Sequence, residues 1–152
     1  MIKIFSHLHS YQIPFVVIGG HAVNFHGYIR ATEDHDIIFK RTAESEDALF
    51  QALQAINACW LSNDIDPQTG IEREVRVSRE YLSCYHLMML YTSMGYLDIF
   101  DYIPGFPNVA VDEVMESADS FHGISMVNLE WLKKMKMSTG RPKDLLDIEN
   151  LP

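Results

Sequence analysis

An apolar run that ends in two glycines is the feature that most constrains the fold of this chain. Phe15 to Ile18 are consecutive apolar residues, and Gly19 and Gly20 follow them directly. Such a run predicts a buried strand that ends in a tight glycine turn. The next segment, residues 21–27, has the pattern of a helix ended by glycine. The turn is therefore either an ordinary strand-to-helix connection or a place where the backbone and the helix N-terminus approach a phosphate.

Two aspartates alternate along the next predicted strand, residues 34–39. Asp34 and Asp36 are two positions apart, so in a strand both side chains project from one face and His35 projects from the other. Neighbouring carboxylates repel each other, and a divalent cation offsets that repulsion. Ligands that are all oxygen suit Mg²⁺ or Mn²⁺. Such a pair is also common on surface strands, so it needs support from elsewhere in the chain.

A third acidic residue stands in an apolar segment further along the chain. Residues 86–91 and 96–102 predict two strands joined as a hairpin. Asp98 lies in the second of these strands between two apolar residues, and a carboxylate in such surroundings requires a partner. Asp98 therefore either joins Asp34 and Asp36 in a carboxylate cluster on neighbouring strands or faces solvent at a sheet edge.

The remaining segments are predicted mostly as helices. The predicted helices span residues 2–9, 45–57, 129–137 (with Asn128 as the N-cap) and 142–148. Residues 63–70 predict a polar loop, and residues 71–81 are ambiguous between a strand and a helix. Residues 111–118 fit a helical turn or a strand. The tyrosines and methionines of residues 81–96 are interpreted as core and hairpin packing.

The order of these features resembles the polymerase-β-type nucleotidyltransferase superfamily. Its signature is a strand, a glycine pair, a helix, a D-x-D strand and a third Asp on a later strand. The chain is more closely similar to the AbiEii/AbiGii-type toxin nucleotidyltransferases and related small bacterial proteins. Their string GG-x-A-x-x-x-H-G-x-x-R-x-T-x-D-x-D is present here as Gly19, Gly20, Ala22, His26, Gly27, Arg30, Thr32, Asp34 and Asp36. A second string, a Lys followed by G-R-P-K-D-L-x-D, is present as Lys136 and residues 140–147.

This resemblance implies an α/β (α+β) fold of the polymerase-β palm type, a mixed β-sheet flanked by helices, in a single domain of residues 1–152. It implies transfer of a nucleoside monophosphate from an NTP to an RNA or protein acceptor, with Mg²⁺ or Mn²⁺ as cofactor. It also implies a role as the toxin of a toxin–antitoxin pair, with an antitoxin as partner. The implied catalytic and metal-binding residues are Asp34, Asp36 and Asp98. The implied nucleotide-binding residues are Gly19, Gly20, Arg30, Thr32, Lys136, Arg141 and Lys143.

The glycine turn departs from the superfamily in one respect that bears on activity. Many members have Gly-Ser at the turn, whereas Gly20 and His21 stand here, so backbone N–H groups take the place of a serine hydroxyl. Larger relatives also carry a helical domain after the catalytic one. The alternative to an active enzyme is a catalytically degenerate module with the same fold that binds nucleotides or a partner.

The basic residues also have structural interpretations. Arg30 either contacts phosphate or pairs with a carboxylate, and Lys136 either contacts phosphate or is an exposed helix lysine. Arg141 and Asp144 fit salt bridging at a helix start, where the helix dipole stabilises an acidic residue. Asp147 is expected to be solvated.

Charge and hydropathy exclude some classes of function. The formal net charge is −9, which argues against non-specific binding to nucleic acid. No basic N-terminal segment precedes a long apolar run, and the apolar stretches are too short to span a bilayer. Because the chain begins with Met and a predicted helix, we expect a complete cytoplasmic protein that does not engage a membrane.

Overall fold

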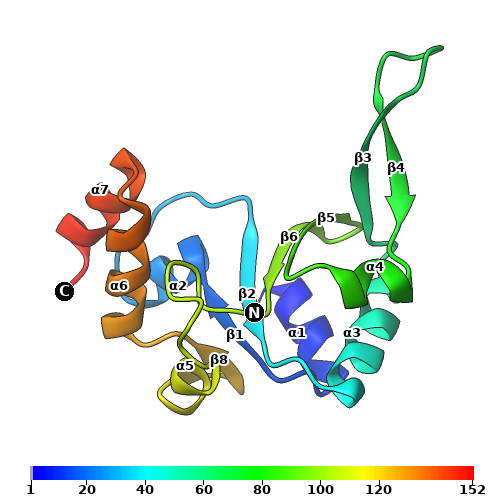
Figure 1. Cartoon of the computed structure of the whole chain (residues 1–152). Coiled ribbons are helices and arrows are strands. Elements are labelled where there is room, and N and C mark those ends of the chain that lie inside the picture. The colour runs from blue at the N-terminus through cyan, green and yellow to red at the C-terminus, as the bar shows by residue number, and fades with distance from the viewer. Residues whose placement is uncertain (1) are drawn as a thin grey trace.

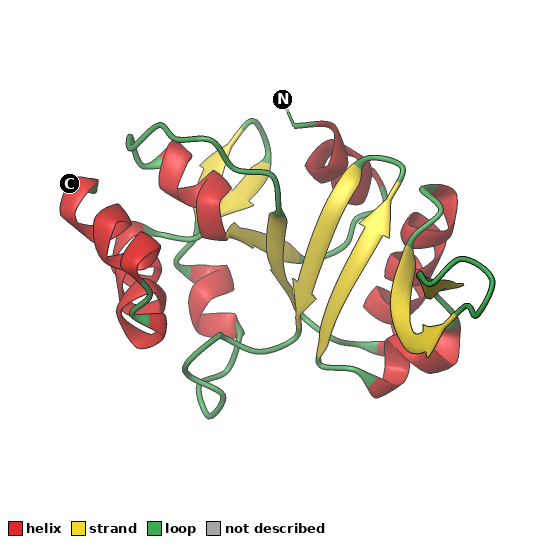
Figure 2. Ribbon diagram, turned by 90° about the horizontal axis from the view of Figure 1, so that it is seen from above, coloured by secondary structure: helices red, strands yellow, loops and turns green. Residues whose placement is uncertain are grey.

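A mixed β-sheet of eight strands forms the centre of the computed structural model, which describes residues 2–152 (Figure 1). Viewed from above, the strands have helices on both sides (Figure 2). The strands are β1 (Phe15–Ile18), β2 (His35–Phe39), β3 (Cys59–Ile65), β4 (Glu72–Arg76), β5 (Leu87–Thr92), β6 (Gly95–Phe100), β7 (Asp119–Phe121) and β8 (Ile124–Met126). The helices are α1 (Lys3–Ser10), α2 (Gly19–Phe25), α3 (Ala43–Ala55), α4 (Arg79–Cys84), α5 (Asp112–Glu116), α6 (Leu129–Thr139) and α7 (Pro142–Asn150). The predicted mixed sheet flanked by helices is confirmed.

The strand order places the candidate site in the interior of the sheet. The order is β4-β3-β5-β6-β2-β1-β8-β7. The pairs β2–β6 and β1–β8 are parallel, and the other neighbours are antiparallel. The predicted hairpin is confirmed, because β5 and β6 pair along their whole length through a short turn. β2 therefore lies between β1 and β6, with hydrogen-bonded neighbours on both sides.

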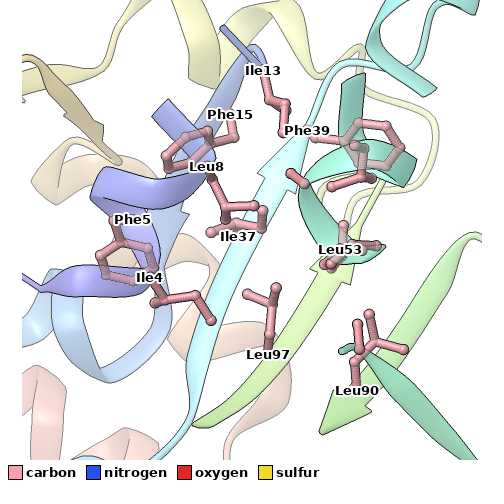
Figure 3. Packing of buried hydrophobic residues seen from close by; sticks show 14 of the residues in the cluster. Ile4, Phe5, Leu8, Ile13, Phe15, Ile37, Phe39, Leu53, Leu90 and Leu97 are labelled. Carbon is pink, nitrogen blue, oxygen red and sulfur yellow. The ribbon is translucent and has the colours of Figure 1, made fainter. Parts of the chain in front are cut away.

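Two apolar clusters occupy the two faces of the sheet. One face packs against α1, α3 and α4, and Figure 3 shows Phe5 and Leu8 of α1 beside Ile37 of β2. The other face packs against α2, α5 and α6 and includes Ile38 of β2. Consecutive residues of β2 thus enter opposite clusters, as strand alternation requires. Full burial of side chains such as Ile37 stabilises the fold by roughly 1.5–3 kcal/mol each.

The helix ends follow ordinary capping chemistry. The predicted N-cap is confirmed, because the Asn128 side chain accepts a hydrogen bond from the Trp131 N–H at the start of α6. Gly140 ends α6 in the left-handed conformation, with φ 58°. At α3, Thr42 and Ser45 cap each other reciprocally. Within residues 2–152, no helix combines the length and the apolar character needed to cross a membrane.

The structure differs from the sequence-based prediction mainly between residues 59 and 84. The predicted polar loop at 63–70 is wrong in its first part, because β3 continues to Ile65 and pairs with β4. The ambiguous segment divides into strand β4 followed by helix α4. β3 and β4 project from the rest of the molecule (Figure 1). Because most of their side chains are exposed, they lack the alternation of buried residues by which a strand is predicted.

Candidate active site

Asp36 and Asp98 lie opposite each other on the parallel strands β2 and β6, as direct register partners. Register partners on adjacent strands project from the same face of a sheet. Both carboxylates lie on the face that packs against α2 and α6, beside Ile38 and Phe100, which are two positions further along each strand. They line one cavity of about 270 Å³ between the sheet and the α6–α7 region, and we call it the small cavity. The sequence prediction that these two aspartates meet is therefore confirmed by the pairing of their strands.

The environment of this pair disfavours two negative charges. Burial is the main cause that raises the pKa of Asp36, and the neighbouring Asp34 carboxylate raises it further. Burial, followed by the charges of Asp36 and Asp34, raises the pKa of Asp98 to about 6. A cation bound between Asp36 and Asp98 would relieve this repulsion.

The glycine turn after β1 approaches the same carboxylates. Gly19 has φ 67°, and a β-carbon at this position would overlap the carboxylate of Asp36. Gly20 is buried, and a β-carbon there would overlap the side chain of Thr32. The missing side chains therefore let the backbone at the start of α2 lie against Asp36 and against the loop that leads into β2.

Asp34 is placed differently from the other two aspartates. It is exposed, lies immediately before β2, and lines a second cavity of about 580 Å³ together with Asp98. We call this the aromatic cavity, because Trp60, Tyr81 and three further tyrosines line it. Asp98 is thus shared by both cavities, whereas Asp36 lines only the small cavity.

The donor chemistry of the pair fits a small divalent cation. Across residues 2–152, no three side chains of His, Cys, Asp or Glu are grouped closely enough to bind a metal ion by themselves. Mg²⁺, however, is commonly held by one or two carboxylates together with waters and substrate phosphates. Asp36 and Asp98 supply oxygen donors of this kind in a half-buried, mutually repulsive pair. Mg²⁺ binding by these residues stays a prediction that their chemistry supports.

An ion cluster centred on the buried residues Lys136, Asp144 and Asp147 borders the small cavity on the side of α6 and α7. Arg30 donates two hydrogen bonds to the Asp147 carboxylate, of 2.6 and 2.8 Å. Lys136 contacts Asp147 at 2.9 Å and Asp144 at 3.2 Å. Arg141 completes the cluster with a 2.8 Å bond from Nε to Asp144. The ion cluster therefore joins three cations to two carboxylates and leaves an excess of positive charge near Asp36.

The contacts within the ion cluster distinguish between the alternative roles predicted for its basic and acidic residues. Asp147 is fully buried, so the expectation that it is solvated is wrong. Its partner Lys136 lies on the preceding helix, whereas Arg30 comes from a distant part of the chain. Lys136 is only 7% exposed, so it is not an exposed helix lysine. The Arg30 guanidinium is committed to a carboxylate. The expected salt bridge of Arg141 with Asp144 at the start of α7 is confirmed.

The cations of the ion cluster lower the pKa values of its two carboxyl groups. Although burial alone would raise the pKa of Asp144, hydrogen bonds from Arg141 and Lys136 outweigh it and lower this pKa to about 2. The pKa of Asp147 is lowered in the same way, by Arg30 and Lys136 against the effect of burial. Both carboxylates are therefore ionised at neutral pH.

The predicted nucleotide-binding residues occupy three kinds of position. Gly19, Lys136 and Arg141 line the small cavity together with Asp36. Arg30 and Thr32 contact the glycine turn on its other side, where Arg30 Nη1 and the Thr32 side chain approach Gly20. Lys143 is exposed on α7 and is outside the lining of the small cavity. The first group is thus the one placed to meet a phosphate beside Asp36.

The histidines near the site have structural contacts. His35 stacks on His21 with ring centroids 4.8 Å apart, and Phe5 packs edge-on against both rings. His35 therefore faces the α1 side of the sheet, as strand alternation predicts. Burial lowers the pKa of His21 to about 4, so this residue is neutral at physiological pH. His26 bonds to the Val127 carbonyl at 2.7 Å and ties α2 to the end of β8.

The aromatic cavity and the acidic members of the ion cluster were not predicted as parts of the site. The interpretation of residues 81–96 as core and hairpin packing holds for the buried Met88 and for Tyr91 and Tyr96, which pack across the hairpin, whereas Tyr85 and Met89 are exposed. The density of tyrosine and methionine in this segment was the available signal. For Asp144 and Asp147, the signal was their spacing of three residues, which places both on one face of α7.

Comparisons with known proteins add distant structural likenesses. No family model and no curated protein matches the chain. A candidate nucleotidyltransferase from H. pylori aligns with 89% of this chain and 55% of its own, at 19% identity and a TM-score of 0.44. The protein JHP933 from Helicobacter pylori aligns with 89% of this chain and 53% of its own, at 15% identity and a TM-score of 0.44. The chain thus spans about half the length of these structures, and the assignment of its site rests on the geometry described above.

Proposed function

We propose that this protein is a metal-dependent nucleotidyltransferase. The observation that carries the proposal is the half-buried Asp36–Asp98 pair, which faces the small cavity between the glycine turn and the cations of the ion cluster. Phosphoryl-transfer enzymes work mainly by positioning the phosphates and neutralising their charge. This cavity offers carboxylates for a metal, backbone for close approach, and cations for phosphate oxygens within one small volume.

The proposed nucleotide position follows from the charges that border the small cavity. Lys136 and Arg141 line it opposite the aspartates, and both lie near enough to Asp36 to oppose the rise in its pKa. A triphosphate seated there would be attracted by these two cations. Gly19 lines the cavity beside Asp36 and has no side chain. Phosphates next to Asp36 could therefore lie close to the backbone of residue 19. The ion cluster fixes Lys136 through two carboxylates, so the ammonium is positioned before a nucleotide arrives.

The proposed reaction joins an acceptor hydroxyl to the α-phosphorus of an NTP and releases pyrophosphate. Asp36 and Asp98, with Asp34 at the mouth of the site, would hold Mg²⁺ or Mn²⁺, which would neutralise phosphate charge and stabilise both the attacking and the leaving oxygens. Asp98 lines both cavities, so its carboxylate is placed to orient the acceptor hydroxyl and to receive its proton.

The test is to titrate the purified chain with each of the four NTPs in the presence of Mg²⁺ by calorimetry, and to follow label from α-labelled NTP. Asp36→Asn should weaken nucleotide binding by about tenfold or more, since it removes a proposed metal ligand. Asp64→Asn is the matched control, because Asp64 is exposed on the projecting hairpin and pairs there with Arg73. If no NTP binds, or if Asp36→Asn binds as the natural chain does, the proposal is wrong. Binding without transfer to any acceptor would instead identify a degenerate nucleotide-binding module.

A role as the toxin of a toxin–antitoxin pair stays a prediction from the sequence resemblance. Controlled expression of the natural chain in bacteria should arrest growth, and expression of Asp36→Asn should not. Equal growth of the two strains at equal protein levels would contradict this role while leaving nucleotidyl transfer intact.

A further inference from the structure

The aromatic cavity lies on a part of the sheet that helices leave uncovered. On β5 and β6, the register pairs Met89–Asp98 and Tyr91–Tyr96 place four side chains on one face. Met89 is 63% exposed and Tyr96 is 43% exposed, although they neighbour the half-buried Asp98. The uncovered face therefore runs from the candidate catalytic carboxylate out to the open surface.

Two groups of aromatic rings form the walls of this cavity. Trp60 stacks on Tyr81 with centroids 4.9 Å apart and an interplanar angle of 9°, and Tyr81 contacts Tyr85 at 4.5 Å. Tyr91 and Tyr96 meet edge to face at 4.7 Å. Tyrosine and tryptophan offer large contact areas at low conformational cost, and tyrosine adds a hydroxyl for hydrogen bonding.

The charge of the lining restricts what this cavity can bind. Among its lining residues the charged side chains are Asp34 and Asp98, both acidic, and none is Lys, Arg or His. Grooves that bind single-stranded nucleic acid combine aromatic rings with a positively charged track for the phosphates. An acidic end and neutral walls instead complement an uncharged or basic polypeptide.

We propose that the aromatic cavity is the acceptor site and that it binds an uncharged or basic peptide segment presenting a serine, threonine or tyrosine hydroxyl at Asp98. This inference rests on the proposed nucleotidyltransferase function and narrows its acceptor to protein. In the transfer step the hydroxyl oxygen forms a bond to the α-phosphorus of the NTP. The bond from that phosphorus to the bridging oxygen of the β-phosphate breaks, pyrophosphate leaves, and the hydroxyl proton passes to Asp98.

The chain offers a matched pair of exposed methionines for the test. Met89 is 63% exposed in the aromatic cavity, and Met137 is 61% exposed on α6, outside it. Met89→Lys places a cation on the cavity wall without disturbing the core, and Met137→Lys places the same cation elsewhere. A cation in the cavity should repel a basic peptide and attract RNA.

The experiment measures binding of three probes to the full chain with Mg²⁺ and a non-hydrolysable ATP analogue. The probes are a short peptide of lysine, serine, tyrosine and leucine, the same peptide with glutamate in place of lysine, and a single-stranded RNA of similar length. The basic peptide should bind about tenfold more tightly than either other probe, a difference of about 1.4 kcal/mol. Met89→Lys should remove most of this preference, and Met137→Lys should leave it within about twofold of the natural chain.

The outcomes separate the acceptor inference from the proposed function. If RNA binds as tightly as the basic peptide, or if Met89→Lys and Met137→Lys behave alike, the peptide acceptor is wrong, although nucleotide binding can still be intact. Loss of ATP-analogue binding in Asp36→Asn, measured in the same series, shows that the nucleotide site is working. Failure of the natural chain to bind the ATP analogue overturns the proposed function itself.

Discussion

The backbone of Gly19 lies so close to the carboxylate of Asp36 that a β-carbon at position 19 would overlap it. Residue 19 directly follows the first buried strand, and residue 36 lies in the antiparallel strand beside it, where its register partner is Ile18. The glycine turn and the strand that carries Asp36 are therefore in direct contact, and a substitution in one should shift the position of the other.

Gly19→Ala should weaken binding of Mg²⁺ and NTP by about tenfold or more, because the new methyl group must displace the Asp36 side chain. Gly70→Ala is the control. Gly70 has φ 69°, close to the 67° of Gly19, but a β-carbon there meets nothing within 4 Å. Both variants should lose about 1–2 kcal/mol of stability through the left-handed backbone. Calorimetric titration of the two variants then isolates the effect of the overlap with Asp36 on nucleotide affinity. Equal nucleotide affinities in the two variants would contradict the prediction.

Asp98→Asn should stabilise the protein at alkaline pH and leave it unchanged in acid. The pKa of Asp98 in the folded protein is about 6, above the ordinary value of 3.8. The stability associated with this carboxyl group is therefore fully present below pH 3.8 and is lost as pH rises through 6. An amide avoids the loss, and we expect a gain of about 1 kcal/mol well above pH 6, reduced from the full value because the group is partly exposed.

The measurement for Asp98→Asn is urea denaturation in metal-free buffer over a series of pH values. The difference in free energy of unfolding from the natural chain should grow with pH and level off above neutrality. A difference that is constant across the series would show that Asp98 titrates normally.

Asp147→Asn should cost about 3–5 kcal/mol of stability, because it leaves Arg30 and Lys136 without a buried counter-charge. Asp64→Asn is the same chemical change at an exposed ion pair with Arg73, and it should cost about 0–1 kcal/mol. Urea denaturation at neutral pH compares the two directly. Similar losses in both variants would mean that the ion cluster contributes no more than a surface pair.

Acid should weaken the protein through the same ion cluster. The pKa of Asp144 is lowered to about 2, so its stabilising contribution is present above the ordinary value of 3.8 and is lost as pH falls through 2. Asp144→Asn should therefore be less stable than the natural chain near neutral pH and should approach it in strong acid. Thermal unfolding followed by circular dichroism at successive pH values gives both curves, and curves that run parallel into strong acid would argue against this role.

The parts of the site that could be predicted from sequence are those set by local spacing. The strand that carries Asp36 was predicted from alternation, although it begins at His35 and leaves Asp34 outside it, and the glycine turn was predicted from the apolar run before it. The alignment of Asp98 with Asp36 also required the register of β2 against β6, which local spacing does not determine. The exposed strand β3 was missed because its residues Asn63 to Ile65 carry no buried alternation.

The buried state of Asp147 could not be predicted from neighbouring residues. Its partner Arg30 is 117 positions away, and a carboxylate on a short helix ordinarily faces water. The aromatic cavity likewise could not be predicted from neighbouring residues, since its rings come from β3, β5, β6 and the α4 region and meet only after the sheet has formed. Tertiary pairing, rather than local propensity, determines both features.

The bond between Arg30 and Asp147 also has a consequence for synthesis of the protein. The loop that delivers Asp34 and Asp36 to the site is anchored by a residue near the end of α7. On a ribosome, that loop is translated long before its anchor emerges. The candidate site of a nascent chain therefore lacks this anchor until residues 142–150 have emerged from the ribosome.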